Sequence, residues 1–319
     1  MAAFKVFDMS TPVSPVADST ALARGLKTRH LTMMGLGSAI GAGLFLGTGV
    51  GIAAAGPAVI LAYVVAGFIT VCFMQMLAEM VAARPSSGTF STYAEQAFGR
   101  WAGFAIGWLY WFMMIMIMAV EITGASAIVA DWFGISPWIP ALAAIAVFTV
   151  INFAAVKNFG EFEFWFSLIK VTAIIALVVG GLALILWGRE VGGTTPDVAH
   201  LWSHDGFAPF GLWGIIMSFS VVVFSFGGIE TLGMTAGEAD DPEHSIARAV
   251  NTVPFRILLF YVAALAVIMS IIPWDEVTGE SSPFVEVFAA LQVPAAQHVM
   301  NFVVLTAALS AMNAIFYAC

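Results

Sequence analysis

Charged residues are scarce in this chain. Lysine, arginine, aspartate and glutamate together make up 10% of its 319 residues, whereas soluble domains carry roughly 25%. Apolar residues make up 61% of the chain and its mean hydropathy is +0.97. This composition excludes an ordinary soluble protein and indicates an integral membrane protein. We expect its partners to be the lipid bilayer and a small substrate, with no nucleic acid.

Cysteine is also nearly absent, and the two that occur, Cys72 and Cys319, lie within apolar stretches. A disulfide framework is therefore not expected. Residues 1–28 contain Pro12 and Pro15 and lack an apolar core. They are predicted to form a cytoplasmic N-terminal tail and not a cleaved signal peptide, so the first membrane span is the internal targeting signal.

Long apolar stretches recur throughout residues 29–319, which are predicted to form the transmembrane domain. Each is close to the roughly 20 residues that a helix needs to cross about 30 Å of hydrocarbon. The expected fold is therefore an all-α polytopic bundle and not a barrel of short strands. Eight spans are predicted, over residues 31–55, 57–83, 101–130, 139–156, 162–187, 210–236 and 253–272, with the eighth beginning near residue 294. The chain ends within this eighth span, and we expect it to be a truncated fragment.

Basic residues fall on one side of this predicted topology. With the N-terminus in the cytoplasm, only Arg189 of the lysines and arginines near the spans lies on the opposite side. This asymmetry follows the positive-inside rule and predicts a multi-pass protein with a cytoplasmic N-terminus. The residues placed on the cytoplasmic side are Arg24, Lys27, Arg29, Arg84, Arg100, Lys157, Arg248 and Arg256.

Glycine is concentrated inside the first predicted span, at Gly37, Gly41 and Gly43. Glycine in a helix interior costs about 1 kcal/mol relative to alanine, so these residues predict a break near the middle of the bilayer. Unwound backbone at that depth normally lines a cavity or binds a ligand. Two alternatives stay open. Gly37-x-x-x-Gly41 and Gly47-x-x-x-Gly51 could be small-residue faces that pack against neighbouring helices. Gly35-x-Gly37-x-x-x-Gly41 partly matches a dinucleotide-binding fingerprint, which would require a βαβ unit.

A second glycine-interrupted site, Phe226 to Glu230, lies five spans after the first. Two interrupted helices in corresponding positions are typical of inverted-repeat transporters, whose substrate site lies near the membrane midplane. We therefore expect one repeat over residues 31–187 and a partial second repeat over residues 210–319. The half-helix beginning near Gly43 would offer amides to a carboxylate, and freed carbonyls would accept from an ammonium group, so a zwitterion fits this site.

Three ionisable residues lie inside predicted spans, where charge is costly and usually functional. Glu230, at the second break, is a candidate for gating, proton handling or substrate contact, or else satisfies freed backbone groups. Lys170 lies roughly ten residues inside the cytoplasmic end, too deep to reach water easily. It is either a proton carrier or a fixed cation bonded to helix carbonyls. Glu121 either takes part in coupling or braces neighbouring helices.

Seven motifs distributed over nearly the whole chain from Arg29 carry a family resemblance. They are Gly-Ser-Ala-Ile-Gly-Ala-Gly-Leu-Phe-Leu-Gly (37–47), Ala-Gly-Pro-Ala (55–58), Pro-x-x-Gly-x-Phe-Ser-x-Tyr (85–93), Phe-Gly-Glu-Phe-Glu-Phe-Trp-Phe (159–166), Phe-Gly-Gly-Ile-Glu (226–230), Ala-Gly-Glu (236–238) and Ala-Ala-Leu-Ser-Ala-Met-Asn (307–313). Together they resemble bacterial amino acid permeases of the amino acid–polyamine–organocation superfamily. Within that family, they are most similar to the motifs of permeases for aromatic and other neutral amino acids.

This resemblance implies a LeuT-type fold of two inverted five-helix repeats, here truncated in the second. It also implies proton-coupled amino acid uptake by alternating access across the bacterial inner membrane. Ala42 and Gly43 would offer amides to the substrate carboxylate, and Phe224 would also be a gate. Lys170 matches a family lysine that takes the place of a coupling sodium ion. The predicted substrate-binding residues are Ala39, Ile40, Gly41, Ala42, Gly43, Phe224 and Gly227. Of these, Ala39, Phe224 and Gly227 would offer carbonyls to the substrate amino group. The predicted coupling or gating residues are Lys170, Glu230 and Glu121.

Other classes of function remain as alternatives. A non-transporting amino acid sensor would use the same cavity, and the chain could be an inactive fragment of a permease. A membrane enzyme is not expected, because no nucleophile–base or metal cluster occurs at the span ends. His200-x-x-x-His204 has metal-like spacing without a further ligand set, so a metal is not expected. No organic cofactor is expected either, and the resemblance implies protons as the coupling ion.

Overall fold

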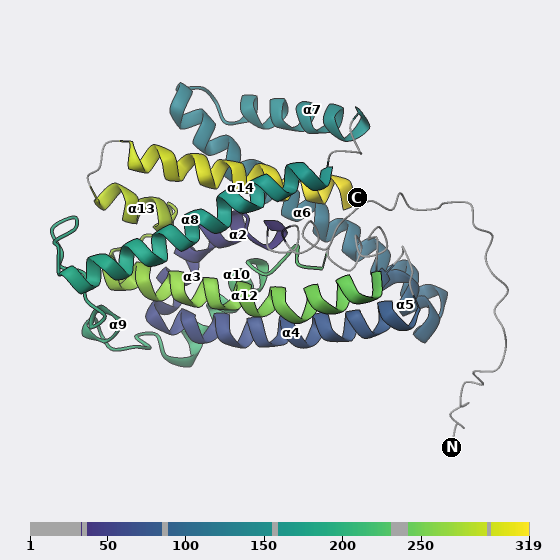
Figure 1. The fold of residues 1–319 in the computed structure, drawn as a ribbon, viewed down its shortest axis with the longest axis horizontal. Helices are drawn as coiled ribbons and strands as arrows, with labels where there is room; N and C mark the ends of the chain where they lie inside the picture. Colours follow the sequence, from purple (N-terminus) through teal and green to yellow (C-terminus); the bar gives the residue numbers. More distant parts are fainter. Residues whose placement is uncertain are drawn as a thin grey trace, which may run out of the picture.

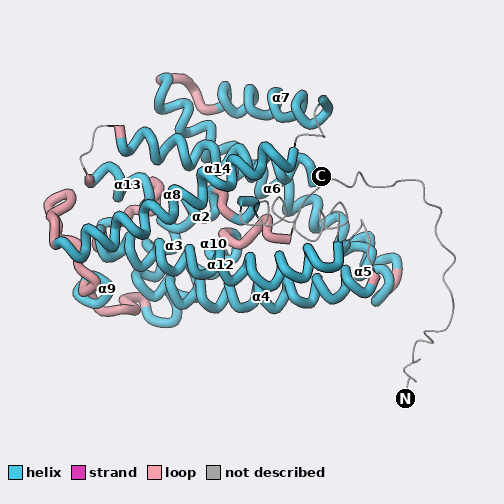
Figure 2. The backbone as a smooth tube through the Cα atoms, in the orientation of Figure 1, coloured by secondary structure: helices cyan, strands magenta, loops and turns pink. Residues whose placement is uncertain are grey.

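The computed structural model of the chain describes residues 33, 37–84, 89–154, 159–230, 242–291 and 295–318. Regular structure within these ranges is helical, apart from an isolated β-bridge between Val191 and Thr194 (Figure 2). No strand occurs in them, so the βαβ unit that a dinucleotide fingerprint requires is absent from the described part of the chain. The predicted tail, residues 1–28, and the motif at residues 236–238 lie outside the described residues.

The helices follow the predicted spans closely. The first span is divided into α2 and α3, and a short amphipathic segment, α5, precedes the third. In chain order the elements are α2 (Ala42–Phe45), α3 (Gly47–Ala55), η1 (Gly56–Ala58), α4 (Val59–Ala83), α5 (Thr89–Phe98), α6 (Arg100–Phe133), α7 (Trp138–Ala154), α8 (Phe159–Trp187), α9 (His200–Ser203), α10 (Gly211–Phe224), α12 (Pro242–Ile271), η4 (Trp274–Glu276), α13 (Pro283–Ala290) and α14 (Ala296–Ala318).

Five helical stretches of the described chain are long and apolar enough to cross a membrane, namely Ala42–Val81, Arg100–Phe133, Glu163–Trp187, Val253–Ile271 and Ala296–Phe316. The first stretch contains two predicted spans, because α3 passes into α4 through the single 3-10 turn of η1. Gly56 ends α3 with a φ of 59°, which favours glycine, and Pro57 follows it. The fourth and sixth predicted spans correspond to shorter apolar helices, Trp138–Val150 and Gly211–Phe224.

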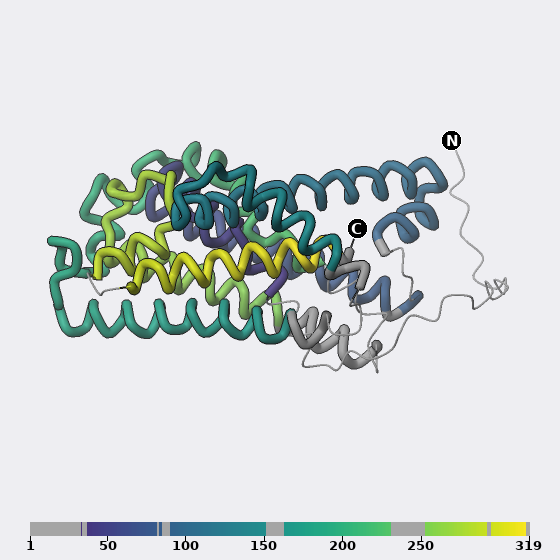
Figure 3. Tube along the Cα trace, turned by 90° about the horizontal axis from the view of Figure 1, so that it is seen from above, coloured from purple at the N-terminus to yellow at the C-terminus, as the bar shows by residue number. Residues whose placement is uncertain are grey.

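Corresponding elements of the two predicted repeats lie against one another (Figures 1 and 3). The first interrupted span packs against the second, through α3 and α10. Likewise α4 packs along α12, and α6 along α14. Helix α8 lies against both α12 and α14, while α7 covers the outer side of α6 and α14. Helix α2 is therefore enclosed by the longer helices, whereas α10 leaves Leu212, Trp213 and Met217 exposed.

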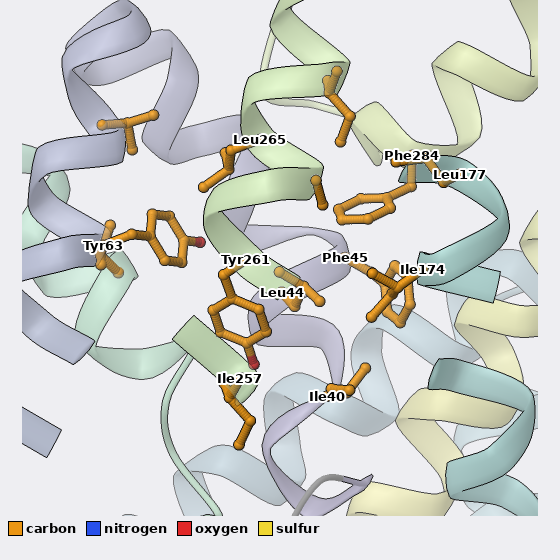
Figure 4. Close-up of a cluster of buried hydrophobic side chains, with 14 of the residues drawn as sticks. Ile40, Leu44, Phe45, Tyr63, Ile174, Leu177, Ile257, Tyr261, Leu265 and Phe284 are labelled. Carbon is orange, nitrogen blue, oxygen red and sulfur yellow. The ribbon is translucent and has the colours of Figure 1, made fainter. Parts of the chain in front are cut away.

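The apolar core surrounds the first broken helix. Leu44 and Phe45 of α2 are fully buried among side chains from α4, α8, α12 and α13 (Figure 4). Phe45 meets Phe284 edge to face, with their ring centroids 4.9 Å apart. By contrast, large apolar side chains such as Phe68 and Trp187 are exposed on the outer faces of α4 and α8. A surface this apolar suits contact with lipid.

Candidate functional site

The predicted break in the first span is confirmed. Residues 37–39 are helical, Ile40 and Gly41 are not, and α2 begins at Ala42. Leu46 joins α2 to α3 with right-handed helical backbone, so the half-helix continues to Ala55. The unwound residues lie among the clustered glycines, where the helical state is intrinsically weakest.

The second predicted break lies just beyond the end of α10 and beside the first break; residues 231–236, the remainder of the predicted sixth span, lie outside the described residues. Helix α10 ends at Phe224, and residues 225–230 form successive turns. Gly228 has a φ of 93°, and a Cβ there would lie 2.5 Å from the carbonyl oxygen of Ser38. Glycine is thus needed at position 228 both for its backbone conformation and for the close approach of the two breaks.

Tyr261 on α12 bridges the two breaks. Its buried hydroxyl lies 2.7 Å from the carbonyl oxygen of Ala39 and 2.8 Å from that of Ser225, so its single proton can be donated to either. The Ser225 hydroxyl in turn donates to the carbonyl of Gly43 at 2.7 Å and lies 3.1 Å from the hydroxyl of Tyr63. Backbone groups freed by the breaks are therefore bonded to buried side chains.

Replacing Tyr261 with phenylalanine should lower the stability of the protein. The change removes the donor shared by two buried carbonyls, and a buried polar group left without a partner costs about 1–3 kcal/mol. Unfolding in detergent should therefore begin at a lower temperature. Tyr93→Phe is the matched control, because the Tyr93 hydroxyl bonds the carbonyl of Arg84 at an exposed position; equal losses in the two variants would contradict the bridging role.

The start of α2 is bonded to Glu121. The amide of Ala42 lies 3.0 and 2.9 Å from the two carboxylate oxygens of Glu121, which is 3% exposed on α6. A helix N-terminus favours a negative charge, so this amide and carboxylate are well matched. The group predicted to meet a substrate carboxylate thus faces a protein carboxylate in this structure.

Phe224 lies directly over Gly43. A Cβ added to Gly43 would meet the Phe224 ring and the Cα of Ser225, each at 3.0 Å. Cβ atoms added to Gly37 or Gly41 would collide with Ser167 or Glu121. The packing interpretation of these glycines therefore holds together with the break: they lie at the break and also allow its close contacts.

Lys170 is completely buried in α8, and its Nζ donates to the carbonyl oxygen of Gly37 at 2.6 Å. This is the contact expected of a fixed cation bonded to a helix carbonyl. It also places the ammonium group at the first break, three residues before Ile40. The structure therefore brings Lys170 and Glu121 to the same broken segment from two different helices.

Glu163 is a fourth buried ionisable residue and is not among the predicted candidates. It is 1% exposed, and its Oε1 accepts a hydrogen bond of 2.6 Å from the hydroxyl of Ser310 on α14. Two signals in the sequence point to it: it lies inside the fifth predicted span, and it precedes Lys170 by seven residues, which puts both on one helix face.

Glu230 lines a cavity of about 460 Å³ beside the second break. The side chain is 7% exposed, and Oε1 has no hydrogen-bond partner among the described residues. Phe224 and Gly227 also line this cavity, so it opens directly onto the predicted substrate residues. Its wall is mostly apolar and is completed by Thr70, Phe73, Phe90, Ile106, Leu109, Tyr110, Met113, Ile117, Val223, Phe226 and Ile229.

The two loop histidines make contacts within the protein. His200 Nδ1 lies 3.1 Å from the carbonyl oxygen of Ser270, and His204 Nδ1 lies 3.2 Å from a carboxylate oxygen of Asp275. The described residues contain no group of three histidine, cysteine, aspartate or glutamate side chains that could hold a metal ion. In this structure the histidines attach the loop to the end of α12 and to η4.

The amino acid permease family model matches residues 30–319 of this chain. The chain belongs to the amino acid permease family. This permease is 52% identical over 301 residues to the aromatic amino acid transport protein AroP of Corynebacterium glutamicum. It is 45% identical over 297 residues to AroP of Escherichia coli K12 and 46% identical over 293 residues to the uncharacterized amino acid permease YtnA of Bacillus subtilis.

These matches cover 92–93% of the permease chain but only 63–65% of the relatives' lengths. The chain therefore spans somewhat less than two thirds of the proteins it matches. Two of these relatives are named as aromatic amino acid transport proteins, and this chain belongs to the same family. The resemblance noted from the sequence motifs is confirmed at the level of the family.

Proposed function

We propose that this permease imports a neutral amino acid with an aromatic side chain across the bacterial cytoplasmic membrane, coupled to protons and by alternating access. The observation that carries this proposal is the meeting of two broken helices at one buried polar site, with an apolar cavity beside it. Main-chain groups at the breaks suit the two charges of an amino acid, and the cavity suits its side chain.

A LeuT-type arrangement of inverted repeats is supported by the pairing of elements. Helices α3, α4 and α6 lie against α10, α12 and α14, their counterparts in the second repeat. Such pairing is expected where two repeats are related by a pseudo-twofold axis. In this proposal, repeat one covers residues 31–187, residues 210–319 belong to repeat two, and the N-terminus is cytoplasmic because the basic residues gather on that side.

The substrate carboxylate would bind the amides of Ala42 and Gly43, displacing Glu121 from the start of α2. The substrate amino group would donate to the carbonyls of Ala39, Phe224 and Gly227. In this structure the Ala39 carbonyl already accepts from Tyr261, and the Phe224 carbonyl accepts from the amide of Gly227 at 2.9 Å. Each carbonyl oxygen has two lone pairs, so a further donor can be accommodated.

The side chain of the substrate would enter the cavity next to Phe224. Aromatic rings of Phe73, Phe90, Tyr110 and Phe226 face this space, and edge-to-face ring contacts favour an aromatic guest. Two relatives that carry the name of aromatic amino acid transport proteins are consistent with this choice. Coupling to protons is assigned to the buried charges around Lys170, with Glu121 and Glu230 as further candidates.

Uptake into proteoliposomes tests this proposal. An inward proton gradient should drive accumulation of labelled L-phenylalanine, and unlabelled L-tyrosine and L-tryptophan should compete better than L-lysine or L-glutamate. Saturable binding without net flux would instead identify a sensor. Accumulation driven by sodium and unaffected by the proton gradient would contradict the role given to Lys170.

A further inference from the structure

Glu163, Ser167 and Lys170 share one face of α8, because four and then three residues separate them. All three are buried, and they face the broken first helix and α14. At one end of this row, Glu163 accepts from Ser310; at the other, Lys170 donates to Gly37. The row therefore connects both repeats at the first break.

Gly37 is where the carboxylate and the ammonium group come together. A Cβ on Gly37 would lie 3.1 Å from Glu163 Oε1 and would overlap the Ser167 hydroxyl, while the Gly37 carbonyl binds Lys170. The side chains of Glu163, Ser167 and Lys170 thus surround Gly37 of the first broken helix.

The charges in this cluster do not balance when every group is ionised. Among the described residues, Glu163 and Lys170 come from α8, Glu121 from α6 and the neutral phenol of Tyr261 from α12, while α14 contributes the uncharged Ser310. Two carboxylates and one ammonium group leave one buried negative charge without a partner. Because an unpaired buried charge is strongly disfavoured, we expect the buried cluster to hold one bound proton.

Glu121 is poorly suited to hold that proton. Both of its oxygens face the amide at the start of α2, a hydrogen bond that favours the ionised carboxylate and would weaken on protonation. Lys170 donates a hydrogen bond to the carbonyl of Gly37 and lies in the same cluster as both carboxylates, so we assign it the positive charge. Glu163 accepts a hydrogen bond from the neutral hydroxyl of Ser310. Protonation of the Glu163 carboxylate would therefore break no contact with a helix terminus.

We propose that Glu163 is the residue that binds and releases the coupled proton, with Lys170 as its fixed counter-charge. On loading, a proton from water forms an O–H bond with the Glu163 carboxylate, and the charge of the cluster rises from −1 to zero. Release breaks that bond, returns the proton to water and restores the −1 charge. Glu163 lies about 10 Å closer than Lys170 to the N-terminal end of α8, which the charge pattern places in the cytoplasm.

The coupling of proton movement to substrate movement follows from this charge balance. The cluster can close around the first break only when Glu163 is protonated, and it can lose the proton only when it is open to water. This inference rests on the proposed proton-coupled uptake and names the residue that performs it. It predicts that a neutral residue at position 163 separates substrate movement from proton movement.

Glu163→Gln tests the inference, because glutamine mimics the protonated acid and still accepts from Ser310. Proton uptake per L-phenylalanine transported should fall at least about 100-fold, the usual contribution of a positioned proton-transfer group. Exchange of labelled for unlabelled L-phenylalanine at equal pH should continue and become independent of pH. Glu163→Asp should restore part of the proton uptake, and Glu190→Gln, an exposed acid after the same helix, should behave as wild type.

Proton uptake at the wild-type ratio in Glu163→Gln would overturn this inference and leave proton-coupled uptake standing. The inference would also be overturned if the folded Glu163→Gln and Glu163→Asp variants both lost exchange as well as accumulation. That result would show that Glu163 has a packing role. If the wild-type protein itself moves no protons with its substrate, the proposed function fails first, and this assignment fails with it.

Discussion

Gly43→Leu should strongly reduce transport. The Cβ alone would meet the Phe224 ring and the Ser225 Cα at 3.0 Å, and the larger side chain would fill the space where α2 begins. Forcing extra atoms into a packed site costs about 1–3 kcal/mol, which corresponds to roughly a 5- to 150-fold loss in a binding equilibrium. Uptake of labelled L-phenylalanine into proteoliposomes is the measurement, together with binding to the purified protein.

Gly180→Leu is the matched control for this change. Gly180 lies in α8 with open space around its missing Cβ, on an exposed face. The same substitution there should leave uptake close to the wild-type rate. If Gly43→Leu folds and transports as well as Gly180→Leu, the close approach of the two breaks is not part of the transport path.

Lys170→Ala should abolish accumulation against a gradient. The change removes the donor to Gly37 and leaves the carboxylates of Glu163 and Glu121 without their counter-charge. Removing one partner from a buried charge arrangement costs about 3–5 kcal/mol. Internal L-phenylalanine should therefore rise only to the external concentration, even with an inward proton gradient.

Arg189→Gln provides the comparison, since Arg189 is an exposed cation just beyond the end of α8. It should accumulate substrate as the wild-type protein does. Folding of Lys170→Ala is checked by its elution as a single species and by exchange of internal for external substrate. Full accumulation in a folded Lys170→Ala variant would show that the lysine does not participate in coupling.

The two breaks were predictable because they depend on local properties of the chain. Clustered glycines weaken a helix wherever it lies, and Gly37, Gly41 and Gly43 mark the first break within a few residues. The row of Glu163, Ser167 and Lys170 on α8 was only partly predictable from the sequence. Lys170 is conspicuous in an apolar span, but Glu163 lies near the end of that span, where a carboxylate commonly reaches water.

The partners of the freed backbone groups were not predictable in the same way. Tyr261 reaches Ala39 across 222 residues of sequence, and Glu121 reaches Ala42 across 79. Such bonds depend on how α12 and α6 are rotated about their axes. In an apolar span every face has similar hydropathy, so periodicity gives little information about which side points inward.

The sequence by itself determined that this protein crosses a membrane, that its first and sixth spans are interrupted, and that Glu121, Lys170 and Glu230 are buried charges. Scarcity of charge and clustering of glycine are enough for that, because both act through the local cost of burying or bending backbone. Only the tertiary structure decided which carboxylate meets the start of α2, which hydroxyl joins the two breaks and that Glu163 completes the charge cluster. Those contacts depend on packing between helices far apart in the chain, where distances of a few ångströms determine whether a polar group has a partner.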